Sequence, residues 1–287
     1  MRNIRFIIPL LGIVLFTYLI SRLSWQKILI NVSELEWWQL LLPALCAASG
    51  IFIKSLRWSY LINCKVEQRK QARDIFLASI FYGMVTPGRI GEFVKIEYLK
   101  DLGYEYKRGL FYTIYDRIFD VIILLISSAL TGYVFGFYSS WLLLMVLFIL
   151  VLGFVLHRKL AFFMNESVSW IRYLKFLLLT VAAYVIYAIG ILFILKIQDL
   201  VESIKTILVV FTGNLVSLIP VSIHGLGTRE SVFFLFLDWL PNETLLVASL
   251  THFFTTFTGT AIFCSLYLGV GLSKRSPLSS NTPLPSD

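Results

Sequence analysis

The sequence predicts an all-α polytopic membrane protein, with about six spanning helices and two re-entrant hairpins arranged as an inverted repeat. Hydrophobic residues make up 58% of the 287 residues, and the mean hydropathy is +0.81. Charged residues make up only 15%, against about 25% in soluble domains. Several apolar runs approach the about 20 residues that a helix needs to cross a bilayer. These observations exclude a soluble enzyme.

Six segments are long and apolar enough to be spanning helices, although the first and fourth are short. The first follows a basic start, and we interpret it as a retained helix and not as a signal peptide, because no small-residue cleavage site follows it. The six segments are residues 6–21, 37–56, 109–133, 141–156, 176–195 and 244–272.

Two further apolar runs, 75–85 and 206–219, are too short to span. At about 1.5 Å per residue, a helix over the first run would reach about halfway through a hydrocarbon core of about 30 Å. Proline and glycine then break each helix. We therefore predict that each segment enters the membrane and returns to the same side. The breaks are expected at Thr86, Pro87, Gly88 and Gly91, and at Pro220, Gly225 and Gly227.

The loop charges predict the orientation. With two hairpins, sixteen lysines and arginines, Lys95 among them, lie in the loops of one side and four on the other. Because basic loops stay in the cytoplasm, both termini should be cytoplasmic in a cell-membrane protein. The same rule accounts for the net charge of +8, so we expect no nucleic-acid partner.

The predicted order of helices divides one membrane domain, residues 1–272, into two inverted halves, 1–133 and 134–272. Pro87 and Pro220 are 133 positions apart, which is close to half the chain. Inverted repeats that meet at broken helices are typical of secondary transporters. Residues 273–287 are rich in serine and proline, and we expect a disordered cytoplasmic tail.

Eight polar residues are predicted to lie at membrane depth and to bind substrate. A charge there costs at least about 2.5–3.5 kcal/mol, so these groups should pair in one cavity near the midplane. Asp116 and Asp120 share a helix face, with Arg117 beside them. The eight are Arg89, Glu92, Asp116, Arg117, Asp120, Arg229, Glu230 and His252.

The arginines indicate a phosphate ligand. Arg89 and Arg229 each lie beside the expected start of a half-helix, where backbone N–H groups and a guanidinium both favour an anion. Glu92 and Glu230 could balance the arginines in an empty site or receive a cationic part of the substrate. The alternative is that these charges are structural ion pairs that lock the hairpins to the bundle.

His252 and two further polar residues, Lys54 and Arg57, have simpler interpretations. Lys54 and Arg57 lie near the cytoplasmic end of the second span, where snorkelling to the interface explains both. His252 could join the cavity or only hydrogen-bond across the bundle.

No catalytic constellation is recognisable. The three histidines do not form HExxH, and Cys46, Cys64 and Cys264 lack metal-ligand spacing. We therefore expect no enzyme activity, no cofactor and no metal site.

The segments TPGRIGEFVKIEYLKD and YDRIFD resemble the flippase-like membrane domain of lysylphosphatidylglycerol synthases. The similarity covers about residues 5–272. It rests on Pro87, Gly88, Arg89, Gly91 and Glu92, on Arg117 and Asp120, on Pro220, Gly225, Gly227 and Glu230, and on Lys54, Arg57 and Trp58.

The resemblance implies lipid translocation between leaflets, which is the role of this domain in the two-domain members. We therefore expect a flippase that moves a phospholipid or a lipid-linked polar headgroup, and the arginines indicate that the headgroup bears a phosphate. The soluble domain that transfers an amino acid in two-domain members has no counterpart here, so we do not expect synthase activity. Two other interpretations stay open: a membrane-embedded transferase that uses a lipid-linked donor, and a structural partner of a lipid-modifying enzyme. A homo-oligomer is also compatible with the sequence.

The two-hairpin topology predicts which loops face the cytoplasm. Single cysteines placed at Lys107 and Arg172, in a cysteine-free background, should be protected from an impermeant thiol reagent in intact cells. Cysteines at Ser139 and Asn242 should be labelled. Labelling at Lys107 or Arg172 from outside would disprove the topology.

Overall fold

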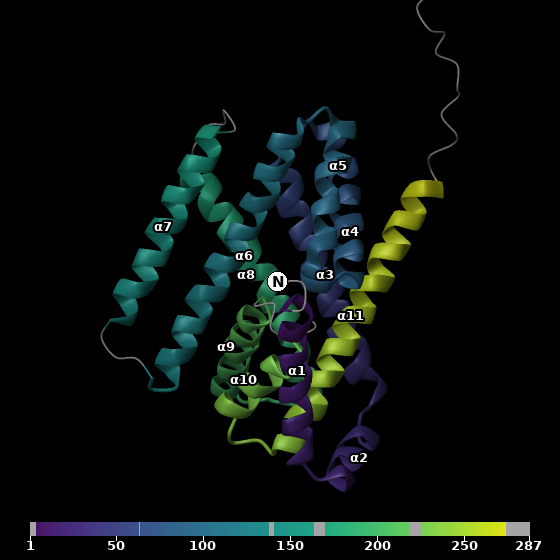
Figure 1. Ribbon diagram of the computed structural model, residues 1–287, viewed down its shortest axis with the longest axis vertical. Coiled ribbons are helices and arrows are strands. Elements are labelled where there is room, and N and C mark those ends of the chain that lie inside the picture. Colours follow the sequence, from purple (N-terminus) through teal and green to yellow (C-terminus); the bar gives the residue numbers. More distant parts are fainter. Residues whose placement is uncertain (1–3, 63, 138–140, 164–169, 219–224, 274–287) are drawn as a thin grey trace, which may run out of the picture.

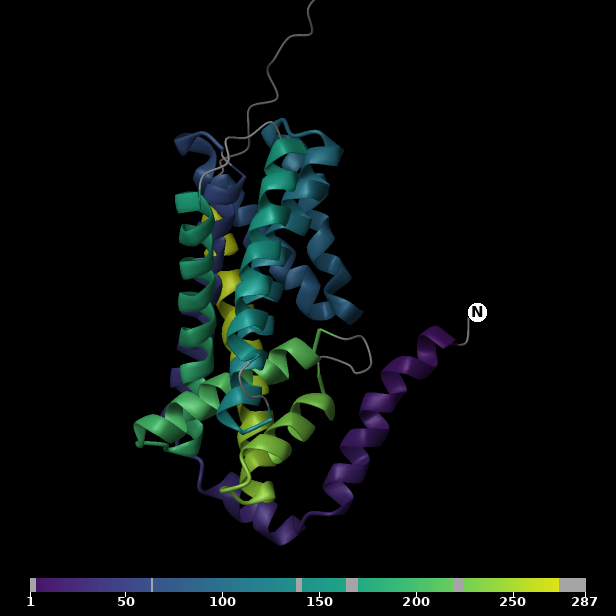
Figure 2. The same ribbon diagram turned by 90° about the vertical axis from the view of Figure 1, so that its left-hand side faces the viewer.

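The computed structural model describes residues 4–62, 64–137, 141–163, 170–218 and 225–273, and every regular element among them is a helix (Figures 1 and 2). This confirms the predicted all-α membrane bundle. Pro220 and the expected tail from 274 lie outside the described residues. The α-helices are α1 Ile4–Ser21, α2 Trp25–Ser33, α3 Trp37–Leu61, α4 Arg69–Val85, α5 Lys95–Leu99, α6 Tyr106–Val134, α7 Leu142–Phe163, α8 Trp170–Leu195, α9 Leu200–Val216, α10 Thr228–Phe236 and α11 Asn242–Ser273.

Four of the described helices, α3, α6, α8 and α11, are long and apolar enough to cross a membrane. A fifth crossing is possible where α1 and α2 meet, at a bend of 96°. Helices α1 and α7 coincide with the two remaining predicted spans. Helix α2 was not predicted from the sequence. The chain is therefore a multi-pass membrane protein.

Helices α3 and α8 form an antiparallel pair at the centre of the bundle. At one end Gln39 donates a hydrogen bond to the Ile194 carbonyl (2.7 Å), and at the other Arg172 donates to the Leu61 carbonyl (3.1 Å). Between them Gly50 faces the backbone of Ala183, where an added methyl carbon would lie 2.8 Å from the carbonyl oxygen. The glycine permits the close approach on which this pair depends.

The first hairpin enters and leaves at the Leu61 end of α3, which we call the basic end. Helix α4 begins there, where the Arg69 guanidinium lies 4.9 Å from the Tyr60 ring. Helix α6 also begins there, beside Tyr104, which donates to the Ile62 carbonyl (2.8 Å). The chain between them, α4, the 3₁₀ helix η2 Pro87–Val94, α5 and η3 Lys100–Leu102, therefore returns to its own side as predicted. Its return arm is mostly 3₁₀ and not a regular α half-helix.

The second hairpin enters and leaves at the opposite end. Helix α9 follows the end of α8, where Lys196 lies 2.8 Å from Glu36 at the start of α3. Helix α11 runs parallel to α3, since Gly259 packs on Ala44 and the Phe263 ring meets Phe52 edge-on. It therefore starts at the end where α9 started. Figure 1 shows α9 and α10 in the half of the bundle opposite to α4 and α5.

The two halves thus share one order: a helix, a second helix, a hairpin and a closing helix. In the first half these are α1, α3, α4 to α5, and α6, with α2 added; in the second they are α7, α8, α9 to α10, and α11. The hairpins enter from opposite ends, which confirms the inverted arrangement.

The close contact at Gly50 predicts a stability effect. Gly50→Leu should lower the free energy of unfolding by about 1–3 kcal/mol, because the new side chain would overlap the Ala183 backbone. Ser49→Leu, at an exposed position of the same helix turn, is the control and should change little. Thermal unfolding in detergent measures both. Equal melting temperatures would show that α3 and α8 can separate without cost.

Candidate functional site

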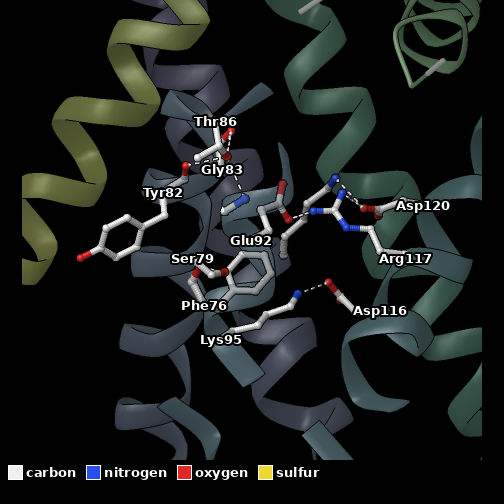
Figure 3. A network of polar contacts seen from close by, with 12 residues as sticks. Phe76, Ser79, Tyr82, Gly83, Thr86, Glu92, Lys95, Asp116, Arg117 and Asp120 are labelled. Atoms are coloured by element: carbon white, nitrogen blue, oxygen red, sulfur yellow. Dashed lines mark hydrogen bonds and ion pairs between the residues drawn. The ribbon is translucent and has the colours of Figure 1, made fainter. Parts of the chain in front are cut away.

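Seven charged side chains from α3, η2, α5 and α6 gather around the first hairpin, and Figure 3 labels Glu92, Lys95, Asp116, Arg117 and Asp120 among them. We call this group the charge network. Its members are Lys54, Arg57, Glu92, Lys95, Asp116, Arg117 and Asp120.

Arg57 lies at the centre of the charge network and is fully buried. Its guanidinium donates to Asp116 (2.7 Å) and to Asp120 (2.9 Å). The two carboxylates are four residues apart on α6 and share one face, as the sequence predicted. A third hydrogen bond, to the Thr180 hydroxyl (2.5 Å), adds α8. One arginine therefore joins three helices.

Lys95 extends the charge network to the hairpin. Its ammonium lies 3.4 Å from Asp116 and faces the rings of Trp58 (4.3 Å) and Phe76 (5.4 Å). The side chain is fully buried. Counting Lys95 among the loop charges is therefore wrong: the short return arm carries it back against α6, where carboxylate and aromatic faces replace its hydration.

Lys54 is the second member of the charge network that α3 contributes. It lies 3.3 Å from Asp120 and 3.9 Å from the centre of the Tyr184 ring. The snorkelling interpretation of Lys54 and Arg57 is therefore wrong, because both turn inward to the carboxylates of α6. A signal was present in the sequence: two cations three apart on one helix match two carboxylates four apart on another.

Arg117 is the accessible member of the charge network. It pairs with Glu92 and lies 3.8 Å from Asp120, yet its side chain keeps 31% of its exposure. The Glu92 side chain packs directly on Gly83 of α4, where any larger residue would overlap it. The exposed side of Arg117 is therefore where a ligand can reach these charges.

The charge network carries more positive charge and more donors than its acceptors can satisfy. It has four cations and three carboxylates. In addition, the buried Nε of Arg57 and Nε1 of Trp58 have no acceptor among the described residues. Each such donor costs about 1–3 kcal/mol. An anion at the exposed side of Arg117 would balance the surplus positive charge.

The other predicted charges form a second group at the start of α10. Arg229 donates to Ser249 (2.9 Å) and to Glu230 (2.7 Å), and Ser249 donates to Glu230 (2.7 Å). The backbone N–H of Gly227 also donates to Glu230 (2.7 Å). This helix start therefore binds its own carboxylate, and the group is balanced in charge.

His252 joins α11 to α8. Its Nε2 lies 3.2 Å from the Tyr187 carbonyl, and the two rings meet at 4.9 Å. This is the cross-bundle contact that we considered as one alternative. The side chain of Arg89 lies outside the described residues. Convergence of both groups on one cavity stays a prediction.

The sequence is similar to that of a known family of membrane domains. A sequence profile of the family described as the lysylphosphatidylglycerol synthase TM region matches residues 6–264, which is most of the chain. A search of curated proteins found no match.

The burial of Arg57 predicts a large stability effect. Arg57→Met should cost about 3–5 kcal/mol, because Asp116 and Asp120 lose their shared cation in a buried site. Adding Asp116→Asn and Asp120→Asn should lower the stability further, because the buried Lys95 and the nearby Lys54 would then lose the carboxylates that they face. Lys100→Met, which breaks an exposed pair with Glu97, is the control and should cost about 0–1 kcal/mol. Equal melting temperatures for Arg57→Met and the wild type would contradict the pairing.

Proposed function

The chain belongs to the lysylphosphatidylglycerol synthase TM region family, and we propose that it moves a phosphate-bearing lipid between the leaflets of the cell membrane without changing it covalently. The membrane bundle and the family support a lipid-related role. The charge network supports the choice of a phosphate headgroup.

The surplus of one positive charge carries this proposal. A phosphodiester headgroup bears one negative charge, so it would balance the four cations and three carboxylates. A zwitterionic headgroup would leave the surplus in place. Because an unbalanced charge at membrane depth is expensive, the charge network favours an anionic lipid over a zwitterionic one.

Glu92 supplies a mechanism for loading and release. In the structure its carboxylate forms an ion pair with the Arg117 guanidinium. A phosphate arriving at the exposed side of Arg117 would exchange with this carboxylate, so the arginine is never left without an anion. Arg89 lies three residues before Glu92 on the same 3₁₀ helix, and we propose that it also binds the phosphate.

The two hairpins provide a route. They enter from opposite ends, so we expect irregular backbone in each half of the bilayer. Its N–H and C=O groups need hydrogen-bond partners that only protein or water can supply there. A headgroup could pass along this polar interior while its acyl chains stay in lipid. We propose that the Arg229 and Glu230 pair serves the half opposite to the charge network, and that the basic end is cytoplasmic.

Arg117→Gln should reduce movement of a fluorescent phosphatidylglycerol across reconstituted vesicles by about tenfold or more, since one charge-assisted hydrogen bond contributes about 1.5–3 kcal/mol. Glu97→Gln, on the exposed side of α5, is the matched control. Mass spectrometry of the lipid should show an unchanged mass. Wild-type rates in Arg117→Gln would refute the site, and a covalently altered lipid would favour the transferase alternative.

Arg229→Gln and Arg89→Gln test the shared cavity in the same assay. Both should abolish movement of the anionic lipid if their arginines bind it. If Arg229→Gln only lowers the melting temperature while lipid still moves at the wild-type rate, the second group is a structural lock. The shared-cavity prediction would then be wrong.

A further inference from the structure

One side of α7 carries a stripe of two cations between two apolar residues. The stripe consists of Val155, Arg158, Lys159 and Phe162, whose spacing of three and four places them on one face. The opposite face contacts the bundle, where Gly153 packs on Ile122 and His157 is hydrogen-bonded to Tyr115. The stripe therefore points away from the protein interior, and α7 lies at the edge of the bundle in Figure 1.

These four residues line a surface hollow of about 560 Å³. Phe162 is 77% exposed and Val155 is 42% exposed, so both present apolar surface at the two ends of the stripe. The cations lie between them. The hollow thus combines apolar walls with a positive centre, which matches an amphipathic anion better than a small inorganic one.

The two cations have no counter-charge among the described residues. Neither Arg158 nor Lys159 forms an ion pair or hydrogen bond there. The neighbouring cations of α8 differ: Arg172 donates to the Leu61 carbonyl and Lys175 lies 4.3 Å from the Tyr60 ring. Two adjacent like charges without a partner favour an external anion.

The position of the stripe along α7 indicates headgroup depth. Towards the middle of the helix, Leu147, Phe148 and Val151 are exposed and apolar, as expected for a surface that faces acyl chains. Arg158 and Lys159 come two helical turns later, near the basic end. Phe162 follows, where aromatic residues commonly meet the interface.

We propose that the α7 stripe is a binding site for an anionic phospholipid, separate from the charge network. The phosphate lies between Arg158 and Lys159. One acyl chain follows Val155 towards the middle of the helix, and Phe162 covers the glycerol from the aqueous side. The lipid comes from the leaflet at the basic end.

Native mass spectrometry of the full chain, titrated with phosphatidylglycerol, tests the site. With Arg117→Gln present in every protein compared, to weaken the interior site, the double variant Arg158→Gln/Lys159→Gln should bind this lipid at least about tenfold more weakly, since each basic residue near a membrane surface contributes about fivefold. Lys107→Gln/Arg108→Gln removes another adjacent exposed pair at the same end and should weaken binding less than about threefold. Phosphatidylcholine binding should not change in either variant.

Two further measurements separate the remaining explanations. Phe162→Ser should also weaken phosphatidylglycerol binding, because it removes apolar surface without changing charge. Excess inorganic phosphate should not compete, which would distinguish a lipid from a free anion. Equal losses of phosphatidylglycerol affinity in the two double variants would show that surface charge alone attracts the lipid. Unchanged binding in Arg158→Gln/Lys159→Gln would show that these two cations are only hydrated and bind no lipid. Either result overturns the proposal, and matching melting temperatures exclude misfolding as the cause.

Discussion

The structure depends on the cost of placing a charge where water cannot reach it. Arg57 is fully buried, and the carboxylates that balance its charge are Asp116 and Asp120, so α3 and α6 must meet at one height. Lys95 must then bring the first hairpin to the same place, because its ammonium has no other carboxylate as close as Asp116 among the described contacts. The charge network therefore determines how the hairpin is seated, and the aromatic faces of Trp58 and Phe76 complete its surroundings.

The two halves of the repeat share one topology but differ in the charge balance of their hairpins. The first hairpin carries surplus positive charge and leaves Arg117 partly exposed. The second is balanced, with Arg229 and Glu230 bonded to each other and to Ser249. Inverted repeats need not be equal in chemistry: the first hairpin has a surplus positive charge for a ligand, whereas the second balances its own charges. This asymmetry is the main reason to assign the anionic headgroup to the first hairpin.

Lipid contacts of two kinds follow from this arrangement. The charge network is an interior site, where three carboxylates of the protein compensate three of its four positive charges. The stripe on α7 lies on the outer surface, where Arg158 and Lys159 have no described partner. A lipid bound at the stripe would add to the packing of α7, which joins the bundle through Gly153, His157 and neighbouring aromatic rings.

The sequence by itself determined the class of fold, four of the spans and the break in the first hairpin, because hydropathy and proline or glycine act locally along the chain. It also placed Asp116 and Asp120 on one helix face, which follows from helical periodicity alone. Only the tertiary structure decided that Lys54, Arg57 and Lys95 are interior residues and that Arg229 and Glu230 satisfy each other. The physical reason is distance along the chain: Lys54 and Asp120 are 66 residues apart. Whether a cationic side chain extends to water or is buried depends on whether a helix remote in sequence brings a carboxylate next to it.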